Sequence, residues 1–462
     1  MRYLKLLAGF SILGWEALSA QTNPVLYEGG RLIIGDESTP IESGAFLTQN
    51  GRIAAIGKKG AIKAAAGAAR IDMTGKTVMP AMNNIHIHIG YEAYTSWSVN
   101  NHTPENVLDH LEREAFYGVG TAMTMGDQPS NFAIQFQQDQ LAGKFRPAAR
   151  FFFAAGMAPP GGGPDALLIT GTTPLHAVYE VSTAEEARAA VRKLAAMKIS
   201  QIKFWVDNRD NTRGSMKKMP PEVYAPLIEE AHKYGILVHA HATNLQDQKG
   251  VVKAGVDVLV HTVANEKIDD ELVALLKEKR PYWAPVMGLG DVAELCEESD
   301  QFIAQTLPDR VIVNVKAGKT WLKSNGCSAP VDAQRDEILK DNFSRMAAAG
   351  ARVVLSTDAG VSAKYSFGSA EHHEIGMYVK FGMSPAQAIV VSTSRPAEVL
   401  RIRDAGTLAK GKRADFIVLN ANPLEDIRNT RKIDSVYLSG VKIDREALRT
   451  RFKNATVPAS TH

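Results

Sequence analysis

The sequence decides its fold in one short run, Asn84-Ile85-His86-Ile87-His88-Ile89-Gly90. Side chains two apart in a β-strand point to the same face. The run therefore predicts a strand with His86 and His88 on one face and its three isoleucines on the other. Two imidazoles aimed at one point suit a divalent metal ion. A strand with two histidines facing solvent is the alternative, and this run alone does not separate the two.

Four later segments share one feature, an apolar run with a titratable residue at or near its C-terminal end. They are residues 201–206, 236–241, 258–261 and 353–358. Helical patterns separate them, and alternating strands and helices indicate parallel βαβ units. In a closed barrel of such units, the C-terminal strand ends meet at one mouth, where catalytic residues gather. The residues that we expect at this mouth are His86, His88, Lys203, His241, His261 and Asp358.

The middle of the chain carries enough strands for such a barrel. Eight candidate strands begin near Asn84, Thr121, Arg150, Gln201, Ile236, Asp257, Tyr282 and Arg352. The amphipathic stretches between them include residues 104–117, 183–197, 221–234, 269–279 and 335–349. Thr183, followed by Glu185 and Glu186, is typical of a helix N-cap with acidic residues in the first turn. The pattern predicts an α/β protein built on a (β/α)8 TIM barrel.

Both ends of the chain are rich in short strands instead. They are residues 31–35, 44–48, 52–57 and 77–79 at one end, and 414–419 and 434–438 at the other. The simplest packing joins them in one small β-sandwich beside the barrel. We therefore predict a sandwich formed by residues 21–80 and 401–462, and a barrel over residues 81–400.

Composition narrows the class of protein. The chain has 462 residues, 45% of them hydrophobic, and a net charge of +3. No basic run or aromatic-basic stripe indicates a nucleic-acid partner, so we expect a small-molecule substrate. A homo-oligomer is compatible with the sequence.

Residues 1–20 resemble a secretory signal peptide, with Arg2 and Lys5, a short apolar run and small residues before Gln21. The apolar run is shorter than the roughly 20 residues that span a bilayer. A membrane anchor and a frayed helix are the alternatives. We expect cleavage near Ala20 and a secreted or periplasmic protein that does not contact a membrane.

Three loops are long and lie on the expected metal side. They are residues 157–182, 207–219 and about 287–330, and long loops in compact domains are usually lids or binding loops. The last one carries Cys296 and Cys327, the two cysteines of the chain. In an oxidising compartment they could form a disulfide, but two buried thiols are equally compatible with the sequence.

This pattern resembles the metal-dependent amidohydrolase superfamily. The matching elements are the run through His86 and His88, then Lys203, His241, His261 and the run 356–360 around Asp358, with a C-terminal return strand at 406–416. Within the superfamily the chain is most similar to the imidazolonepropionase-related and Xaa-Pro dipeptidase-like branch.

The resemblance implies a role for each residue of the mouth. His86, His88 and Asp358 hold one divalent ion, which we expect to be zinc, and His241 and His261 hold a second. Lys203 bridges the two ions as a carbamate, because an ammonium cation cannot ligate a metal. The alternative for Lys203 is a salt-bridged structural lysine. His239 shares a strand face with His241, but the 20-residue spacing from His241 to His261 matches the family, so we expect His239 to be packed one layer deeper.

The expected reaction is hydrolysis of an amide or peptide bond. Two metals lower the pKa of a bridging water, the resulting hydroxide attacks a carbonyl carbon, and Asp358 moves the proton to the leaving nitrogen. An ester, lactone or phosphoester substrate is the alternative, and a metal-free scaffold protein is disfavoured because all six ligands are present. Weaker candidates for substrate contact are Tyr91, His176, Arg209, His372 and His373.

Overall fold

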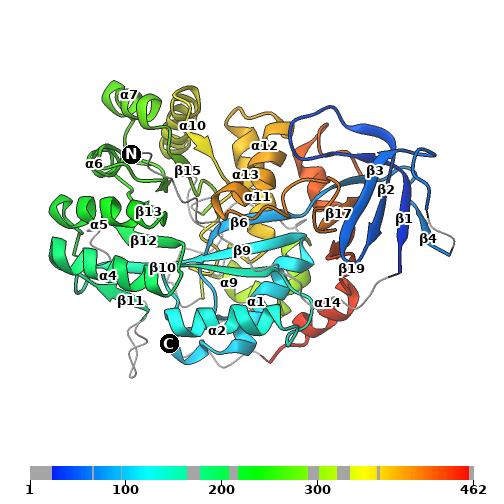
Figure 1. Ribbon diagram of the computed structural model, residues 1–462, viewed down its shortest axis with the longest axis horizontal. Helices are drawn as coiled ribbons and strands as arrows, with labels where there is room; N and C mark the ends of the chain where they lie inside the picture. Colours follow the sequence, from blue (N-terminus) through cyan, green and yellow to red (C-terminus); the bar gives the residue numbers. More distant parts are fainter. Residues whose placement is uncertain are drawn as a thin grey trace, which may run out of the picture.

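The computed structural model describes residues 23–64, 67–94, 96–163, 177–207, 217–289, 301–319, 333–361 and 365–456. The predicted signal peptide, His176, Arg209 and both cysteines lie outside these residues. Figure 1 shows the strands of a barrel with helices around them. A second sheet, made of the two ends of the chain, lies at the right of the view. Among the described helices, none combines the length and the apolar character needed to cross a membrane.

Eight parallel strands form the barrel, and each begins close to its predicted position. In the order of their pairing they are β6 (Met82–Ile87), β9 (Val119–Met125), β10 (Arg150–Ala158), β12 (Gln201–Trp205), β13 (Leu237–His241), β14 (Val258–Val260), β15 (Tyr282–Ala284) and β16 (Arg352–Val353). A ninth strand, β11 (Val178–Glu180), pairs with β10.

Backbone hydrogen bonds close the sheet between its first and last strands. The segment after β16 runs beside β6, where the Ile85 amide donates to the Leu355 carbonyl at 3.2 Å. Further along, the Asp358 amide donates to the His86 carbonyl at 2.8 Å, and the His88 amide to the Ala359 carbonyl at 2.7 Å. This closure places Asp358 beside the two histidines of β6.

The five predicted helices are present. They are α1 (Pro104–Phe116), α4 (Ala184–Ala196), α5 (Pro221–Lys233), α7 (Asp270–Lys279) and α10 (Ala333–Ala348). Thr183 caps α4 in a capping box with Glu186, as its sequence indicates. The other α-helices of the described residues are α2 (Ser130–Leu141), α6 (Leu245–Lys253), α9 (Asp309–Lys316), α11 (Ser369–Lys380), α12 (Pro385–Ser392), α13 (Ser394–Val399) and α14 (Arg445–Lys453).

The prediction that three isoleucines cover one face of the first barrel strand is wrong for one of them. Ile87 and Ile89 belong to the main core between strands and helices, whereas Ile85 packs with Met123 and Val258 in a separate cluster. The cause is a register shift between β6 and β9, where Asn84 faces Ala122 but Ile87 faces Thr124. Such a bulge inserts one extra residue and re-aims the side chains around it.

The two chain ends share one sheet, as predicted. Its strands are β1 (Val25–Leu32), β2 (Ile41–Gln49), β3 (Arg52–Lys58), β4 (Ala69–Asp72), β5 (Thr77–Pro80), β17 (Phe416–Leu419), β18 (Ile433–Leu438) and β19 (Val441–Lys442). The order is β19-β18-β17-β5-β1-β2-β3, with β4 also paired to β1. The predicted first strand, 31–35, is wrong in position. The strand begins earlier, at Val25, and runs through Gly29 and Gly30 to Leu32, and it accommodates the two glycines through register shifts and a φ of +92° at Gly29.

This terminal sheet curls around an aromatic core. The rings of Phe46 on β2 and Phe416 on β17 lie 5.0 Å apart between centroids, although two strands separate β2 from β17. In a flat sheet that separation would be about 14 Å, since paired strands are about 4.8 Å apart. Tyr27 and Tyr437 pack in the same cluster. The division of this sheet into two sandwich layers, and the domain boundaries, stay predictions.

Candidate metal centre

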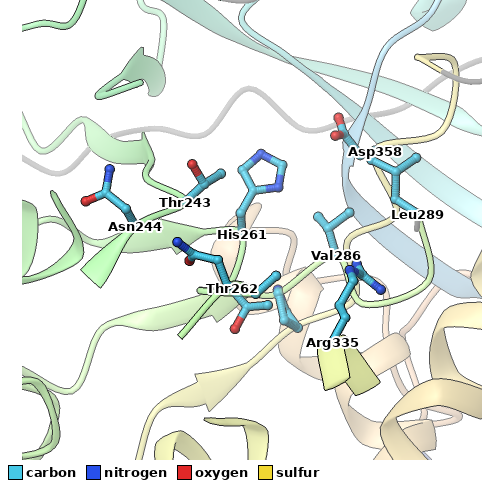
Figure 2. A pocket seen from close by; sticks show the side chains of 11 residues that line it. Thr243, Asn244, His261, Thr262, Val286, Leu289, Arg335 and Asp358 are labelled. Atoms are coloured by element: carbon cyan, nitrogen blue, oxygen red, sulfur yellow. The ribbon is translucent and has the colours of Figure 1, made fainter. Parts of the chain in front are cut away.

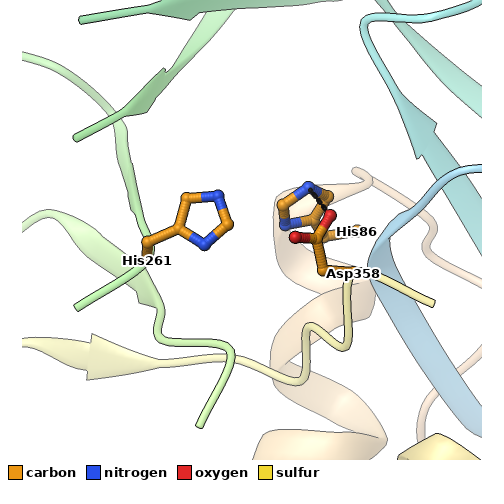
Figure 3. A group of neighbouring side chains, drawn as sticks. All are labelled: His86, His261 and Asp358. Atoms are coloured by element: carbon orange, nitrogen blue, oxygen red, sulfur yellow. Dashed lines mark ion pairs between the residues drawn. The ribbon is translucent and has the colours of Figure 1, made fainter. Parts of the chain in front are cut away.

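Three buried side chains from different barrel strands converge at the mouth. His86 on β6, His261 just after β14 and Asp358 after β16 each place one potential ligand atom within 4.8 Å of those of the other two. Figure 3 shows the three side chains directed toward one another. The parallel topology therefore brings together residues that lie as many as 272 positions apart in the sequence.

His88 completes a compact donor set with two of these residues. Oδ1 of Asp358 lies 3.1 Å from Nε2 of His86 and 2.9 Å from Nε2 of His88. The two Nε2 atoms are 3.3 Å apart. Two imidazole nitrogens and a carboxylate oxygen form a ligand set typical of zinc and of other first-row divalent metals.

A second pair of imidazoles lies next to this set. The ring centroids of His241 and His261 are 4.2 Å apart, and those of His261 and His86 are 5.3 Å apart. Nε2 of His241 is hydrogen-bonded to Oδ2 of Asp207 at 2.8 Å. The structure thus brings together the four histidines that the sequence predicted.

Lys203 is buried within the same group of side chains. Its charge contributes to lowering the pKa values of His86, His239 and His261. Its side chain is 1% exposed, and its Nζ lies 5.6 Å from the centroid of the Trp205 ring. The amine is therefore close enough to these imidazoles for its charge to act on them.

Burial sets the protonation states of these groups. It lowers the pKa of His86 to about 3 and that of His261 well below its usual value. Burial opposes ionisation of Asp358, but its electrostatic interaction with His86 and the hydrogen bonds from His86 and His88 outweigh it and lower the pKa of this carboxyl. Neutral imidazoles and an ionised carboxylate are the forms that bind metals.

Two aspartates that the sequence analysis missed hold the histidines in place. Oδ2 of Asp127 bonds to Nδ1 of His88 at 2.9 Å, as Asp207 bonds to His241. Tyr91 donates its hydroxyl hydrogen to the Asp127 carbonyl, and Thr124 donates to Oδ1 of Asp127. Carboxylates on the far nitrogen fix the orientation and tautomer of a ligating histidine. Each of the two aspartates lies two residues beyond the end of a barrel strand, which is the signal that could have found them.

A buried polar network supports the strand that carries His86. Asn84 accepts a hydrogen bond from the His86 amide at 2.9 Å and donates to Thr357 at 2.7 Å and to Glu371 at 2.5 Å. Glu371 lies next to Glu114, and both are fully buried. Burial raises the pKa of Glu114 well above its usual value, the negative charge of Glu371 adds to this rise, and burial also raises the pKa of Glu371. The pair therefore retains a proton that exposed carboxyls lose.

The backbone is strained at three residues around the mouth. His261, Val286 and Asp358 have φ values of +74°, +53° and +62°. Positive φ is costly for residues with a Cβ, above all for a β-branched valine. Such outliers cluster where the surrounding structure enforces a functional geometry.

A cavity of about 490 Å³ opens at the candidate metal centre, as Figure 2 shows. Its walls include the metal-side residues His261 and Asp358. The remaining lining residues are Thr243, Asn244, Thr262, Ala264, Asn265, Pro285, Val286, Leu289 and Arg335. The sequence analysis singled out none of these side chains by number. Leu289 lies in the long loop 287–330 that it expected to be a lid or binding loop, and Thr243 and Thr262 each lie two residues beyond a barrel strand.

Glu374 on α11 fixes one wall of this cavity. Its carboxylate accepts hydrogen bonds from the amides of Met287 and Gly288, both at 2.7 Å, and from the Tyr365 hydroxyl at 2.8 Å. A Cβ at position 288 would collide with the hydroxyl of Tyr365 and the ring of His373. The loop after β15 is thus held by a buried carboxylate.

The weaker sequence candidates lie elsewhere. Tyr91 is fully buried, and its ring stacks on Trp97 with centroids 4.9 Å apart. His373 is buried against Tyr365, and His372 bonds to the Tyr117 carbonyl at 2.8 Å. Since the residues that line the described cavity include none of these three, a substrate role for Tyr91 or His373 stays a prediction.

His239 lies inside the barrel, outside the donor set. Its Nε2 donates to Oε1 of Gln201 at 2.7 Å, and its side chain is fully buried. This is the packed position, away from the mouth, that the sequence analysis expected for the competitor of His241.

Comparison with known proteins gives the class of this chain. The sequence profile of the Amidohydrolase family matches residues 77–443. The chain therefore belongs to the amidohydrolase family and is a hydrolase, as the sequence motifs predicted.

Particular relatives share its length or its fold. Ochratoxinase from Aspergillus niger is 24% identical over 437 residues, which cover 87% of this chain and 82% of that protein. The crystal structure of a Xaa-Pro dipeptidase with methionine in its active site superposes with a TM-score of 0.70 at 25% identity, covering 91% of this chain and 99% of that one.

Other similarities are shorter. Imidazolonepropionase from Deinococcus deserti is 30% identical over 103 residues, 21% of this chain and 25% of that protein. The chain spans only 15% of the length of the adenine deaminase from Lysinibacillus sphaericus that it also matches. These matches indicate shared ancestry and leave the substrate open.

Proposed function

We propose that this chain is a binuclear metal-dependent hydrolase that cleaves an amide or peptide C–N bond. The observation that carries the proposal is the convergence of the His86, His88 and Asp358 ligand atoms within about 3 Å of one another, beside the His241–His261 pair. The choice of an amide bond over an ester, lactone or phosphoester draws on the relatives, which include a dipeptidase.

The donor set fits two divalent ions. His86, His88 and Asp358 would hold one ion, and His241 and His261 the other, with Lys203 between them as a carbamate. Lys203 supports this assignment because a buried ammonium among imidazoles opposes cation binding, whereas a carbamate supplies anionic oxygens. When bound, the ions, which we propose to be zinc, lower the pKa of a bridging water so that hydroxide is available, and they polarise the substrate carbonyl.

The chain's own residues would manage the proton and the geometry. Asp358 faces both the donor set and the cavity, so its carboxylate can accept a proton from the attacking water and deliver it to the leaving nitrogen. The C–N bond breaks as the new C–O bond is completed, giving a carboxylic acid and an amine. Asp127 and Asp207 keep His88 and His241 oriented during this change.

A substrate panel tests the reaction. Purified enzyme is assayed with N-acyl amino acids, dipeptides, lactones and aryl phosphates, before and after removal of metal by a chelator. We expect amide hydrolysis that is lost on chelation and restored by added zinc. Faster turnover of lactones or aryl phosphates would favour the alternative substrate class.

Lys203→Ala tests the carbamate. We expect it to lose most activity and to recover part of it when short carboxylic acids are added, because these supply the missing anionic oxygens. Lys233→Ala, at an exposed position on α5, is the control. Wild-type activity in Lys203→Ala would contradict the bridging role.

We also propose that residues 1–20 direct export and that the terminal sheet forms the small β-sandwich. The basic start and short apolar run support the first proposal, and the close contact of Phe46 with Phe416 supports the second. Mass spectrometry of protein from its native cells, compared between cytoplasm and exported fractions, tests export: an intact Met1 on cytoplasmic protein would contradict it.

A further inference from the structure

We propose that Trp283 on β15 and Gln248 on α6 are positioning residues that hold His261 in the backbone conformation required for binding the second metal ion. This inference rests on the proposed function, because it concerns how one ligand of that same centre is held. Neither residue is among the described residues that line the cavity. Both contact the backbone of His261, and it is through this backbone that they act.

His261 has a backbone conformation that needs support. Its φ is +74°, in the left-handed region, which costs free energy for a residue with a Cβ. A change in φ would redirect the Cα–Cβ bond and with it the imidazole. In the present conformation the ring lies 4.2 Å from that of His241 between centroids, and Figure 3 shows it directed toward His86 and Asp358.

Three hydrogen bonds hold the peptide groups on either side of this residue. The His261 amide donates to the Ala284 carbonyl at 2.8 Å, which is an ordinary backbone bond from the end of β14 to β15. The His261 carbonyl accepts from the indole Nε1 of Trp283 at 2.9 Å and from Nε2 of Gln248 at 3.4 Å. The orientation of this carbonyl is therefore set by two side chains.

Trp283 is itself held in one position. It is fully buried, it lies opposite Leu259 in the pairing of β15 with β14, and its ring centroid is 5.4 Å from that of Phe343 on α10. An indole has a single N–H donor and no acceptor. Its one hydrogen bond is thus directed at the His261 carbonyl by the packing of the strand and the helix.

Gln248 links the two histidines of the second ion. It is fully buried, and its Nε2 donates to the carbonyl of Ala242, the residue after His241, at 3.1 Å as well as to that of His261. Because both partners are carbonyls, the amide nitrogen and not the oxygen must face them. One side chain therefore ties the backbone beside His241 to that of His261.

The ligands of the first ion are held in another way. The His86 carbonyl accepts hydrogen bonds from the amides of Thr357 and Asp358 at 3.2 and 2.8 Å. These are backbone bonds, which a substitution of Trp283 or Gln248 does not remove. The difference predicts that such a substitution weakens the binding of one ion and spares the other.

Trp283→Phe tests this prediction, because it removes the indole donor and keeps an aromatic ring. Metal-free protein is titrated with zinc in competition with a chelator of known affinity. We expect the affinity for one of the two ions to fall roughly 3- to 10-fold, the scale of one hydrogen bond, and that for the other to stay at the wild-type value. Anomalous diffraction from crystals at limiting zinc should show the lower occupancy beside His241 and His261.

Two further variants complete the comparison. Tyr282→Phe, at the neighbouring position of β15, removes a hydrogen bond to Glu398 at 3.2 Å and should leave both affinities unchanged. Gln248→Met removes the other donor to His261 and should weaken the same ion as Trp283→Phe, so it provides the test if Trp283→Phe does not fold. Thermal unfolding reports the stability of each variant, and a purely structural role would lower stability without separating the two ions.

Two results would overturn the proposal. One is an equal loss of affinity for both ions, or for neither, in the folded variants. The other comes from crystal structures of the metal-free variants, in which we expect the φ of His261 to move away from +74°; an unchanged φ would refute the positioning role. If the wild-type protein binds fewer than two zinc ions, the proposed function fails, and the metal-free structures still decide whether Trp283 and Gln248 position His261.

Discussion

The two ends of the barrel strands bury different kinds of groups. At the N-terminal end Arg150 and Arg413 lie beside Asp404 and Asp415. At the C-terminal end imidazoles lie around Asp358, namely those of His86, His88 and His261. The Arg150–Asp404 contact is 3.1 Å, and Arg413 bonds to both oxygens of Asp415 at 2.9 and 3.3 Å. Burial raises the pKa of Asp415, but the charges of Arg413 and Arg150 outweigh it and lower that pKa. At this end each buried charge meets an opposite charge.

The buried groups at the mouth are not arranged as pairs of opposite charges. Burial lowers the pKa values of His86 and His261. Asp127 and Asp207 bond to the outer nitrogens of the other two histidines, His88 and His241. Neutral nitrogen donors stabilise one another little, but they suit a divalent cation. The comparison teaches that the buried charges at the base of the barrel pair with one another and stabilise the fold, whereas the groups at the mouth form a donor set that we propose holds a metal.

Asp358→Asn should show the largest effect. We expect kcat to fall by a factor of about 10² or more, because general acid-base help is lost, while urea unfolding stays close to wild type. Asp270→Asn, on the exposed surface of α7, is the matched control. A loss of only a few-fold at saturating zinc would show that another group moves the proton.

Asp415→Ala should lower stability and leave the metal centre unchanged. Its removal leaves two arginines at the base with one carboxylate fewer, and breaking a buried pair costs about 3–5 kcal/mol of unfolding free energy. Urea denaturation measures this loss, and the metal content of the folded fraction should stay at the wild-type value. Loss of metal without loss of stability would contradict the claim that the charges at the base of the barrel stabilise the fold and do not hold the metal.

Asp127→Ala should have an intermediate effect, confined to the metal centre. We expect the affinity for zinc to fall about 10- to 100-fold, as is typical when the partner of a ligating histidine is removed. Competition with a chelator of known affinity measures it. Asp127→Asn should be milder, since its amide oxygen can still accept the Nδ1 hydrogen of His88. Identical behaviour of the two variants would argue against an orienting role.

Glu114→Gln should give the smallest effect, visible only in its pH dependence. The pKa values of Glu114 and Glu371 are raised in the folded state. Once the pH exceeds the pKa that these carboxyls have in the unfolded chain, the native state therefore binds more protons than the unfolded chain. Stability contributed by these groups is therefore present at low pH and lost as pH rises toward the folded-state pKa. The variant should be more stable than wild type at neutral pH, with the difference shrinking near pH 4. An equal difference at both pH values would contradict the shared proton.

The sequence predicted which side chains meet at the mouth because strand periodicity and parallel topology are local and general rules. His86, His88, Lys203, His241, His261 and Asp358 all lie at or near strand ends, and parallel strands bring such ends together. The bulge that separates Ile85 from Ile87 could not be predicted, because it depends on pairing with β9.

The sequence analysis also missed site residues on loops and helices, because their positions depend on packing between distant parts of the chain. Arg335 reaches the cavity only through the placement of α10, and Asp127 reaches His88 only through the turn after β9. Arg335 has no strand-end signal, and Asp127 has only its place two residues beyond the end of β9. Long-range packing decides them, whereas the ligand positions follow from the order of strands along the chain.

The most direct test is the metal content of active enzyme. Elemental analysis of protein purified without chelators, followed by titration of metal-free protein with zinc while activity is recorded, should give two ions per chain and activity that rises as the sites fill. Full activity with no more than trace metal would contradict the account, because the donor set at the mouth would then serve some other purpose.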